Sequence, residues 1–265
     1  MTSAETAAMD VSATAPIPFS RLVRVELRKS YDTRASFWLL ASIAIVVGLV
    51  EAIVLIVVTV NDDPINFGDF VGAAAFFTSI LLPVLGIMLV TSEWSQRSAM
   101  VTFALEPRRP RVVWAKLVVG VVLTLVTALG ATALGLVMNL LYAVLHGDPD
   151  WTFGWKYFFG FLIVQSLAMI GGFALAALLL NTPAAIVVFF VYKWVLPSIF
   201  GIASYYLDWF DDASQWFDFQ RAQGPLTDLS ISGGADWAHL LVSGVIWLAL
   251  PLVVGLRRIL RAEVK

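Results

Sequence analysis

The 265-residue sequence contains no cysteine, which excludes disulfide bonds, thiolate metal sites and cysteine nucleophiles. It has only two histidines, and charged residues make up only 14% of it. Two motifs of enzymes are also absent: the G-x-x-x-x-G-K-[ST] loop that binds nucleotide phosphates and the H-E-x-x-H motif of zinc proteases. We therefore expect no catalytic residue, no metal and no other cofactor in this chain. Nothing in its charge pattern supports binding to nucleic acid.

Apolar residues, in contrast, make up 60% of the sequence. They form six runs of at least 20 residues each, at 37–60, 70–90, 112–145, 157–180, 184–207 and 237–256. A bilayer core about 30 Å thick requires roughly 20 helical residues, and a backbone within it must form hydrogen bonds with itself. The runs predict an all-α integral membrane protein with six transmembrane helices in one domain, 37–256.

The basic residues predict the orientation of these helices. All but Lys156, Lys193 and Arg221 of the 17 lysines and arginines lie in the N-terminal segment, the second loop or the tail, 257–265. The first, third and fifth loops carry aspartates instead. Because short loops rich in Lys and Arg stay in the cytoplasm, we expect both termini inside the cell and the long fifth loop, 208–236, outside.

The chain before the first run has two parts. Residues 1–18 are rich in Ala, Thr and Ser and have no continuous apolar core, so we interpret them as a disordered leader. Residues 19–36 have a helical period, and we predict an amphipathic helix on the inner membrane surface. Its apolar arc consists of Phe19, Leu22, Val23, Leu27 and Tyr31, opposite its arginines. The alternative is that these arginines only anchor the topology.

The second loop contains a further predicted helix, at 93–106. No helix breaker occurs before Pro107, and Trp94, Val101 and Leu105 share one helical face. We expect a short helix in the cytoplasm.

Two charged residues, Glu51 and Lys193, lie deep within the first and fifth runs. Each costs about 2.5 to 3.5 kcal/mol at the centre of a transmembrane helix, so each should face protein or water. Their depths are similar enough for an ion pair between the two spans. The alternative is that Glu51 lines a polar crevice or the transport path, while Lys193 extends to the interface.

Two segments resemble the permease subunits of type 2 ABC transporters, the bacterial exporter class. In the first, LVRVELRKSYDTRASFWLL, the matching residues are Glu26, Arg28, Lys29 and Arg34. In the second, SEWSQRSAMVTFALEPRRPRVVWAKL, they are Glu93, Trp94, Ser98, Thr102, Pro107, Arg111, Ala115 and Lys116. Arg97 stands where the family usually has glycine.

The resemblance implies a permease of the bacterial inner (plasma) membrane that moves a hydrophobic or amphipathic substrate outward. Such a chain hydrolyses no ATP itself; it docks a separate ABC ATPase subunit, in two copies, and pairs with a second permease, either identical or a sister chain. Docking would involve Glu93, Trp94, Arg97, Ser98, Val101, Thr102, Leu105, Pro107, Arg108, Arg109 and Arg111. The alternatives are a proton-driven secondary transporter, with Glu51 as carrier, and a non-transporting membrane anchor or assembly factor.

The predicted topology can be tested by cysteine labelling, because the chain has no cysteine of its own. A cysteine at Asp218 should react with an impermeant thiol reagent in intact cells. Cysteines at Arg109 and Arg258 should react only after the cells are broken. Labelling of position 109 in intact cells would contradict the orientation.

Overall fold

The computed structural model describes residues 17–96, 98–147 and 149–261, which form helices and loops with no strand among them. Six helical stretches are long and apolar enough to cross a bilayer. They are α2 (Arg34–Asn61), α3 (Phe67–Ser95), α5 (Arg109–His146), α6 (Trp155–Leu179), and two composite spans, Thr182–Tyr206 and Gly234–Arg261. The prediction of an all-α, multi-pass membrane protein with six spans is confirmed.

Each composite span contains a π-helical turn that the sequence patterns did not indicate. The fifth span consists of α7 (Thr182–Phe190), η1 (Val191–Val195) and α8 (Leu196–Tyr206), and the sixth of α11 (Gly234–Gly244), η3 (Val245–Ala249) and α12 (Leu250–Arg261). A proline, Pro197 or Pro251, stands two residues after each π turn. Because proline donates no backbone hydrogen bond, it disrupts the regular ladder of an α-helix and favours such turns. The rings of Tyr192 and Trp247 join the two π turns, with centroids 4.5 Å apart.

The shorter helices lie outside the spans. They are α1 (Phe19–Asp32), α4 (Ala99–Leu105), α9 (Asp208–Ser214), α10 (Phe219–Ala222) and the 3-10 turn η2 (Gly224–Leu226). The last three lie within the segment expected to form the long fifth loop, 208–236.

Two of the expected helices have different bounds. The helix expected over 19–36 is interrupted at Thr33, whose hydroxyl caps α2 by accepting a hydrogen bond from the backbone N–H of Ser36 (3.3 Å). The expected helix at 93–106 is shorter, because Glu93 and Trp94 form the last turns of α3 and only α4 is a separate helix. No residue before Ser95 breaks α3, so the transmembrane helix simply continues.

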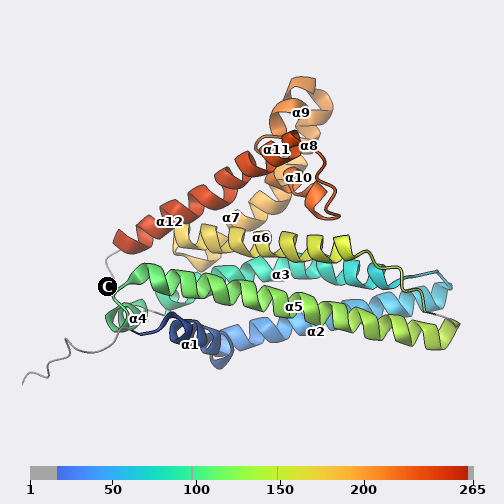
Figure 1. Cartoon of the computed structure of the whole chain (residues 1–265), viewed down its shortest axis with the longest axis horizontal. Helices are drawn as coiled ribbons and strands as arrows, with labels where there is room; N and C mark the ends of the chain where they lie inside the picture. Colours follow the sequence, from blue (N-terminus) through green and yellow to red (C-terminus); the bar gives the residue numbers. More distant parts are fainter. Residues whose placement is uncertain (1–16, 97, 148, 262–265) are drawn as a thin grey trace, which may run out of the picture.

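The structure has a four-helix bundle of α2, α3, α5 and α6, from which the two composite spans diverge (Figure 1). All of these meet at one end, which we call the basic end. There Arg111 donates a hydrogen bond to the carbonyl of Ile17 (2.6 Å), and Arg109 donates one to the carbonyl of Ile259 (2.8 Å). Both ends of the described chain therefore lie at the basic end, as an even number of spans requires. Residues 1–16 of the predicted leader and 262–265 of the predicted tail lie outside the described residues.

Small residues allow the central helices to approach closely. A Cβ atom on Gly172 of α6 would lie 2.5 Å from the carbonyl oxygen of Pro83 in α3, and one on Gly255 of α12 would lie 2.6 Å from the backbone of Ala177 in α6. Such contacts bring backbones together where apolar burial gives no driving force, because the surrounding lipid is equally apolar. The α6 helix is thus packed between α3 and α12.

We predict that Gly172→Ala lowers the free energy of unfolding by about 1 to 3 kcal/mol, because the added methyl group forces two backbones apart. The matched control is Gly130→Ala in α5, where a Cβ atom meets nothing within 4 Å. That change should raise helix stability by up to about 1 kcal/mol. Thermal unfolding in detergent measures both. Equal effects of the two changes would refute the close packing of α3 and α6.

Candidate functional site at the basic end

Four charged side chains form a network at the basic end, which we call the four-charge network. Glu26 and Lys29 come from α1, Glu93 from the end of α3, and Lys116 from near the start of α5. Because two are acidic and two basic, the network is neutral. It connects three helices that are distant in the sequence.

The distances within the network are short. Lys29 Nζ lies 2.7 Å from Glu26 Oε1 and 2.7 Å from Glu93 Oε1. Lys116 Nζ lies 2.7 Å from Glu26 Oε2 and 3.2 Å from Glu93 Oε1. The hydroxyl of Thr102, on α4, donates a further hydrogen bond to Glu93 Oε1 (3.1 Å). One oxygen of Glu93 therefore joins α1, α4 and α5 to α3.

Burial raises the free-energy cost of breaking these contacts. Glu26, Glu93 and Lys116 are each no more than 7% exposed, whereas Lys29 is half-buried. Removing one partner from a buried ion pair leaves an uncompensated charge, at a cost of about 3 to 5 kcal/mol. The network therefore resists any movement that separates α1, α3 and α5 at this end. Surface ion pairs, such as that between Arg28 and Asp32, impose no comparable constraint.

Lys29 stays charged within the network. Burial alone would lower the pKa of its ammonium group, but the carboxylates of Glu26 and Glu93 outweigh this and raise the pKa above its ordinary value of 10.5. A base whose pKa is raised on folding stabilises the fold below its unfolded pKa and loses that effect as the pH rises through the folded value. The contribution of Lys29 is therefore constant at neutral pH and is lost only above pH 10.5.

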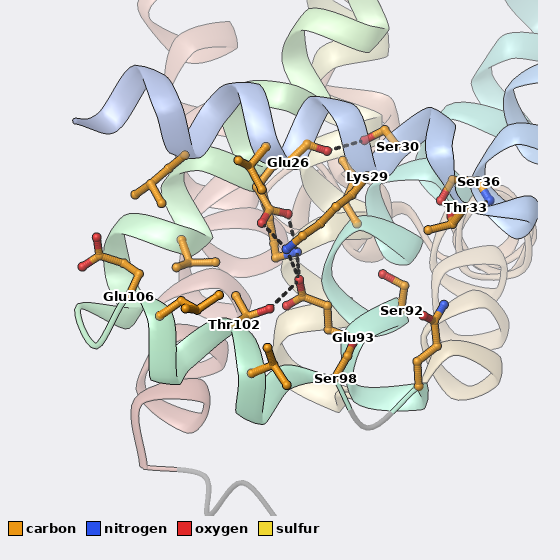
Figure 2. Close-up of a pocket in the computed structure, with 18 of the residues that line it drawn as sticks. Glu26, Lys29, Ser30, Thr33, Ser36, Ser92, Glu93, Ser98, Thr102 and Glu106 are labelled. Atoms are coloured by element: carbon orange, nitrogen blue, oxygen red, sulfur yellow. Dashed lines mark hydrogen bonds and ion pairs between the residues drawn. The ribbon is translucent and has the colours of Figure 1, made fainter. Parts of the chain in front are cut away.

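A groove of about 420 Å³ lies between α1 and α4, and the four-charge network forms part of its lining. Figure 2 shows Glu26 and Lys29 extending from α1 toward Glu93 and Thr102 on the opposite side. The groove is rimmed by apolar side chains: Leu22 and Val25 of α1, and Val101 and Leu105 of α4. Val101 is 62% exposed and Leu105 is 72% exposed. An exposed apolar edge around a charged floor is typical of a surface that binds a partner.

A second set of contacts fixes the far end of α4. Arg111 Nη1 lies 2.9 Å from Glu106 Oε2, and the other oxygen of Glu106 accepts a hydrogen bond from the backbone N–H of Arg108 (3.3 Å). The guanidinium of Arg109 lies 4.9 Å from the ring centre of Phe103 in α4, and also bonds the end of α12. Cations at the carbonyl end of a helix are favourable. The α4 helix is thereby attached to α5 and α12.

The predicted docking residues fall into two groups in the structure. Those on the outer face are Val101, Leu105, Pro107 and Arg108, which are exposed, with Ser98, Thr102, Arg109 and Arg111 half-buried beside them. Glu93 instead is buried in the four-charge network, and Trp94 packs inward against Phe103, with ring centroids 6.3 Å apart. Arg97 lies outside the described residues.

The expectation that Trp94 shares an exposed face with Val101 and Leu105 is therefore wrong. It assumed one continuous helix, whereas the chain turns between α3 and α4, and the backbone N–H of Ser98 closes this turn by bonding the carbonyl of Glu93 (2.9 Å). Trp94 thus supports α4 from beneath instead of meeting a partner.

The hypothesis of an ion pair between Glu51 and Lys193 is also wrong for this conformation. Glu51 is fully buried in α2, and neither of its carboxyl oxygens has a hydrogen-bond partner. The ammonium of Lys193, in η1, lies 5.9 Å from the ring centre of Trp194. The physical reason is placement: α3 packs against both α2 and α7, and Figure 1 shows these two on opposite sides of it.

Sequence reasoning singled out all four members of the four-charge network without predicting their contacts. Glu26, Lys29, Glu93 and Lys116 were matched to a family pattern, but only Glu93 was expected in the site. A usable signal was present: each lies beside the inner end of a predicted span, where charges of opposite sign must find each other or water. Their positions at the basic end of neighbouring helices predict a cluster, though not its partners.

Comparison with known proteins gives no further assignment: no family model and no curated protein matches this chain. Its function must be inferred from the geometry described above.

We predict that Lys116→Met and Glu26→Gln each lower the free energy of unfolding by about 3 to 5 kcal/mol, because each leaves the buried, otherwise neutral network with one uncompensated charge. The double variant should lose less than the sum of the two. Thermal unfolding in detergent provides the double-mutant cycle. Asp32→Asn, in the exposed pair with Arg28, is the control and should change little. Strictly additive losses would show that Glu26 and Lys116 do not interact.

Proposed function

We propose that this protein is the membrane-spanning permease subunit of an ATP-driven exporter of the type 2 ABC class. It would lie in the bacterial inner membrane with its basic end in the cytoplasm. It would hydrolyse no ATP itself but dock a separate ATPase subunit, and it would move a hydrophobic or amphipathic substrate together with a second permease subunit.

One observation carries this proposal. The two segments that resemble the permease family, 22–40 and 92–117, lie far apart in the sequence yet contribute every member of the four-charge network. Thr102, another residue of the family pattern, is hydrogen-bonded to the same network. A fortuitous resemblance has no reason to place its matching residues in one buried cluster. Their contact supports a common structural role.

The geometry also suits the transmission of force from a partner. The α4 helix is only seven residues long, exposes Val101 and Leu105 on one side, and is attached on the other to α3, α5 and α12. A helix held in this way cannot move without moving the spans to which it is bound. Binding energy from a cytoplasmic partner can thus become tilting of transmembrane helices.

The partner surface is mixed in character. Val101 and Leu105 are apolar anchors of the kind that contribute most binding energy, and Arg108 at the rim is positioned to meet an acidic group. We expect the ATPase to cover this face of α4. The groove between α1 and α4 lies directly beside it, so α1 would also be close to the docked partner.

We predict that Leu105→Asp uncouples ATP hydrolysis from transport. The apolar anchor should contribute about 2 kcal/mol or more to binding of the ATPase, and a buried carboxylate would oppose that binding. Copurification of the two subunits and substrate-stimulated ATP hydrolysis measure the effect. Val144→Asp, at an equally exposed apolar position near the opposite end of α5, is the control and should leave both unchanged.

The same experiments distinguish the alternatives. Normal copurification and transport with Leu105→Asp would refute docking through α4. Transport that persists without any ATPase would favour a proton-driven secondary transporter. A stable complex in which ATP hydrolysis is never stimulated would indicate a membrane anchor or assembly factor.

A further inference from the structure

Glu51 occupies an unusual position in the bundle. It continues a buried stripe of α2 formed at four-residue spacing with Ile43 and Val47, which pack in one apolar cluster with Ala74 of α3 and Ala131 of α5. Other buried acids among the described residues retain slight exposure, but Glu51 has none. No lipid, partner subunit or substrate can touch it while α2 is packed in this way.

The carboxyl group of Glu51 lacks the contacts that an ionised acid needs. Neither oxygen has a hydrogen-bond partner among the described residues, whereas Glu26, Glu93 and Glu106 all accept bonds from lysine, arginine or backbone groups. The hydroxyls of Thr78 and Thr124, which are buried in neighbouring spans, bond backbone carbonyls one turn before them.

No counter-charge is available from the helices packed around it. The α2 helix carries no other ionisable residue between Arg34 and Asp62, and α3 carries none between Asp69 and Glu93. The α5 helix carries none between Lys116 and Tyr142. The remaining neighbour of α2 is helix α1, which precedes it in the chain and packs near the start of α2. Arg34, the first residue of α2, is roughly 25 Å along the helix from Glu51.

A metal ion does not account for Glu51 either. A hard cation requires several oxygen ligands, and the described residues contain no group of three acidic, histidine or cysteine side chains that could hold one. The full burial of Glu51 also leaves no water-sized space beside it. A proton is the one ligand that fits. It removes the charge, needs no extra room, and avoids the large penalty of an isolated carboxylate in an apolar interior.

We propose that Glu51 is a proton-binding site inside the membrane bundle. Its carboxyl is protonated while α2 is packed on α3 and α5, and it releases the proton only when α2 separates from them and water reaches it. Proton binding and α2 packing are then thermodynamically linked, so each favours the other. Alkaline pH therefore favours the separated state, whatever drives transport.

Infrared spectroscopy tests the protonation directly. The full chain at neutral pH, in a detergent without ester or carboxylic acid groups, should show the carbonyl stretch of a protonated carboxylic acid. Exposed Asp and Glu side chains are ionised at this pH and do not contribute to that band. The band should shift in heavy water and be missing from Glu51→Gln, which keeps the size and neutrality of the acid. Absence of the band from the wild-type protein would overturn the proposal even if the variant did not fold.

Thiol labelling tests the link to α2. A cysteine at Val47, one turn from Glu51 and 4% exposed, is protected while α2 is packed. The rate at which a membrane-permeant reagent labels this cysteine should rise more steeply with pH when Glu51 is present than in the Glu51→Gln variant. The ratio of the two rates should grow by up to about tenfold per pH unit, the limit for one linked proton. The Gln background corrects for the titration of the thiol itself. Identical pH dependence in the two backgrounds would refute the link.

Discussion

The shared carboxylate of Glu93 is the contact on which the basic end of this protein depends. One of its oxygens contacts Lys29 of α1, Lys116 of α5 and the hydroxyl of Thr102 of α4, while its own backbone lies in the last turn of the transmembrane helix α3. Separating either lysine from it leaves an uncompensated charge in the network, which costs more free energy than the loss of most single contacts in the fold. Because this contact is directional and its loss costs much free energy, it fixes the position of α4 relative to the spans.

Apolar packing governs the rest of the structure and acts differently. Between the helices of a membrane protein, burial of apolar surface adds little, so close approach at positions such as Gly172 and Gly255 must supply the stability. Such contacts permit sliding and tilting better than ion pairs do. The two composite spans diverge from the bundle away from the basic end (Figure 1). The four-charge network lies at the basic end, on α1, α3 and α5. Rigidity is therefore concentrated where a cytoplasmic partner would bind.

The six spans could be predicted because length and hydropathy respond to the bilayer itself, a constraint that each helix meets alone. Features that depend on two elements at once were less accessible. The turn before α4 contains no proline or glycine that would predict it, so the sequence pattern wrongly places Trp94 on the same face as Val101 and Leu105. The interruption at Thr33 likewise has no proline or glycine beside it. The π turns depend on Pro197 and Pro251, which hydropathy counts as ordinary members of a run. Whether Glu51 and Lys193 meet depends on the arrangement of helices, which depth alone does not specify.

The buried acids of this chain show how surroundings decide the role of one chemical group. Glu26 and Glu93 each lie within ion-pair distance of two lysines, and these contacts hold α1, α3 and α5 together. Glu51 lies in an apolar interface without any partner, so its charge must be removed before α2 can pack. The first arrangement resists movement at neutral pH, where Lys29 stays charged. The second makes the packing of α2 on α3 and α5 depend on a bound proton. A change of pH can therefore alter the packing of α2 without breaking the network at the basic end.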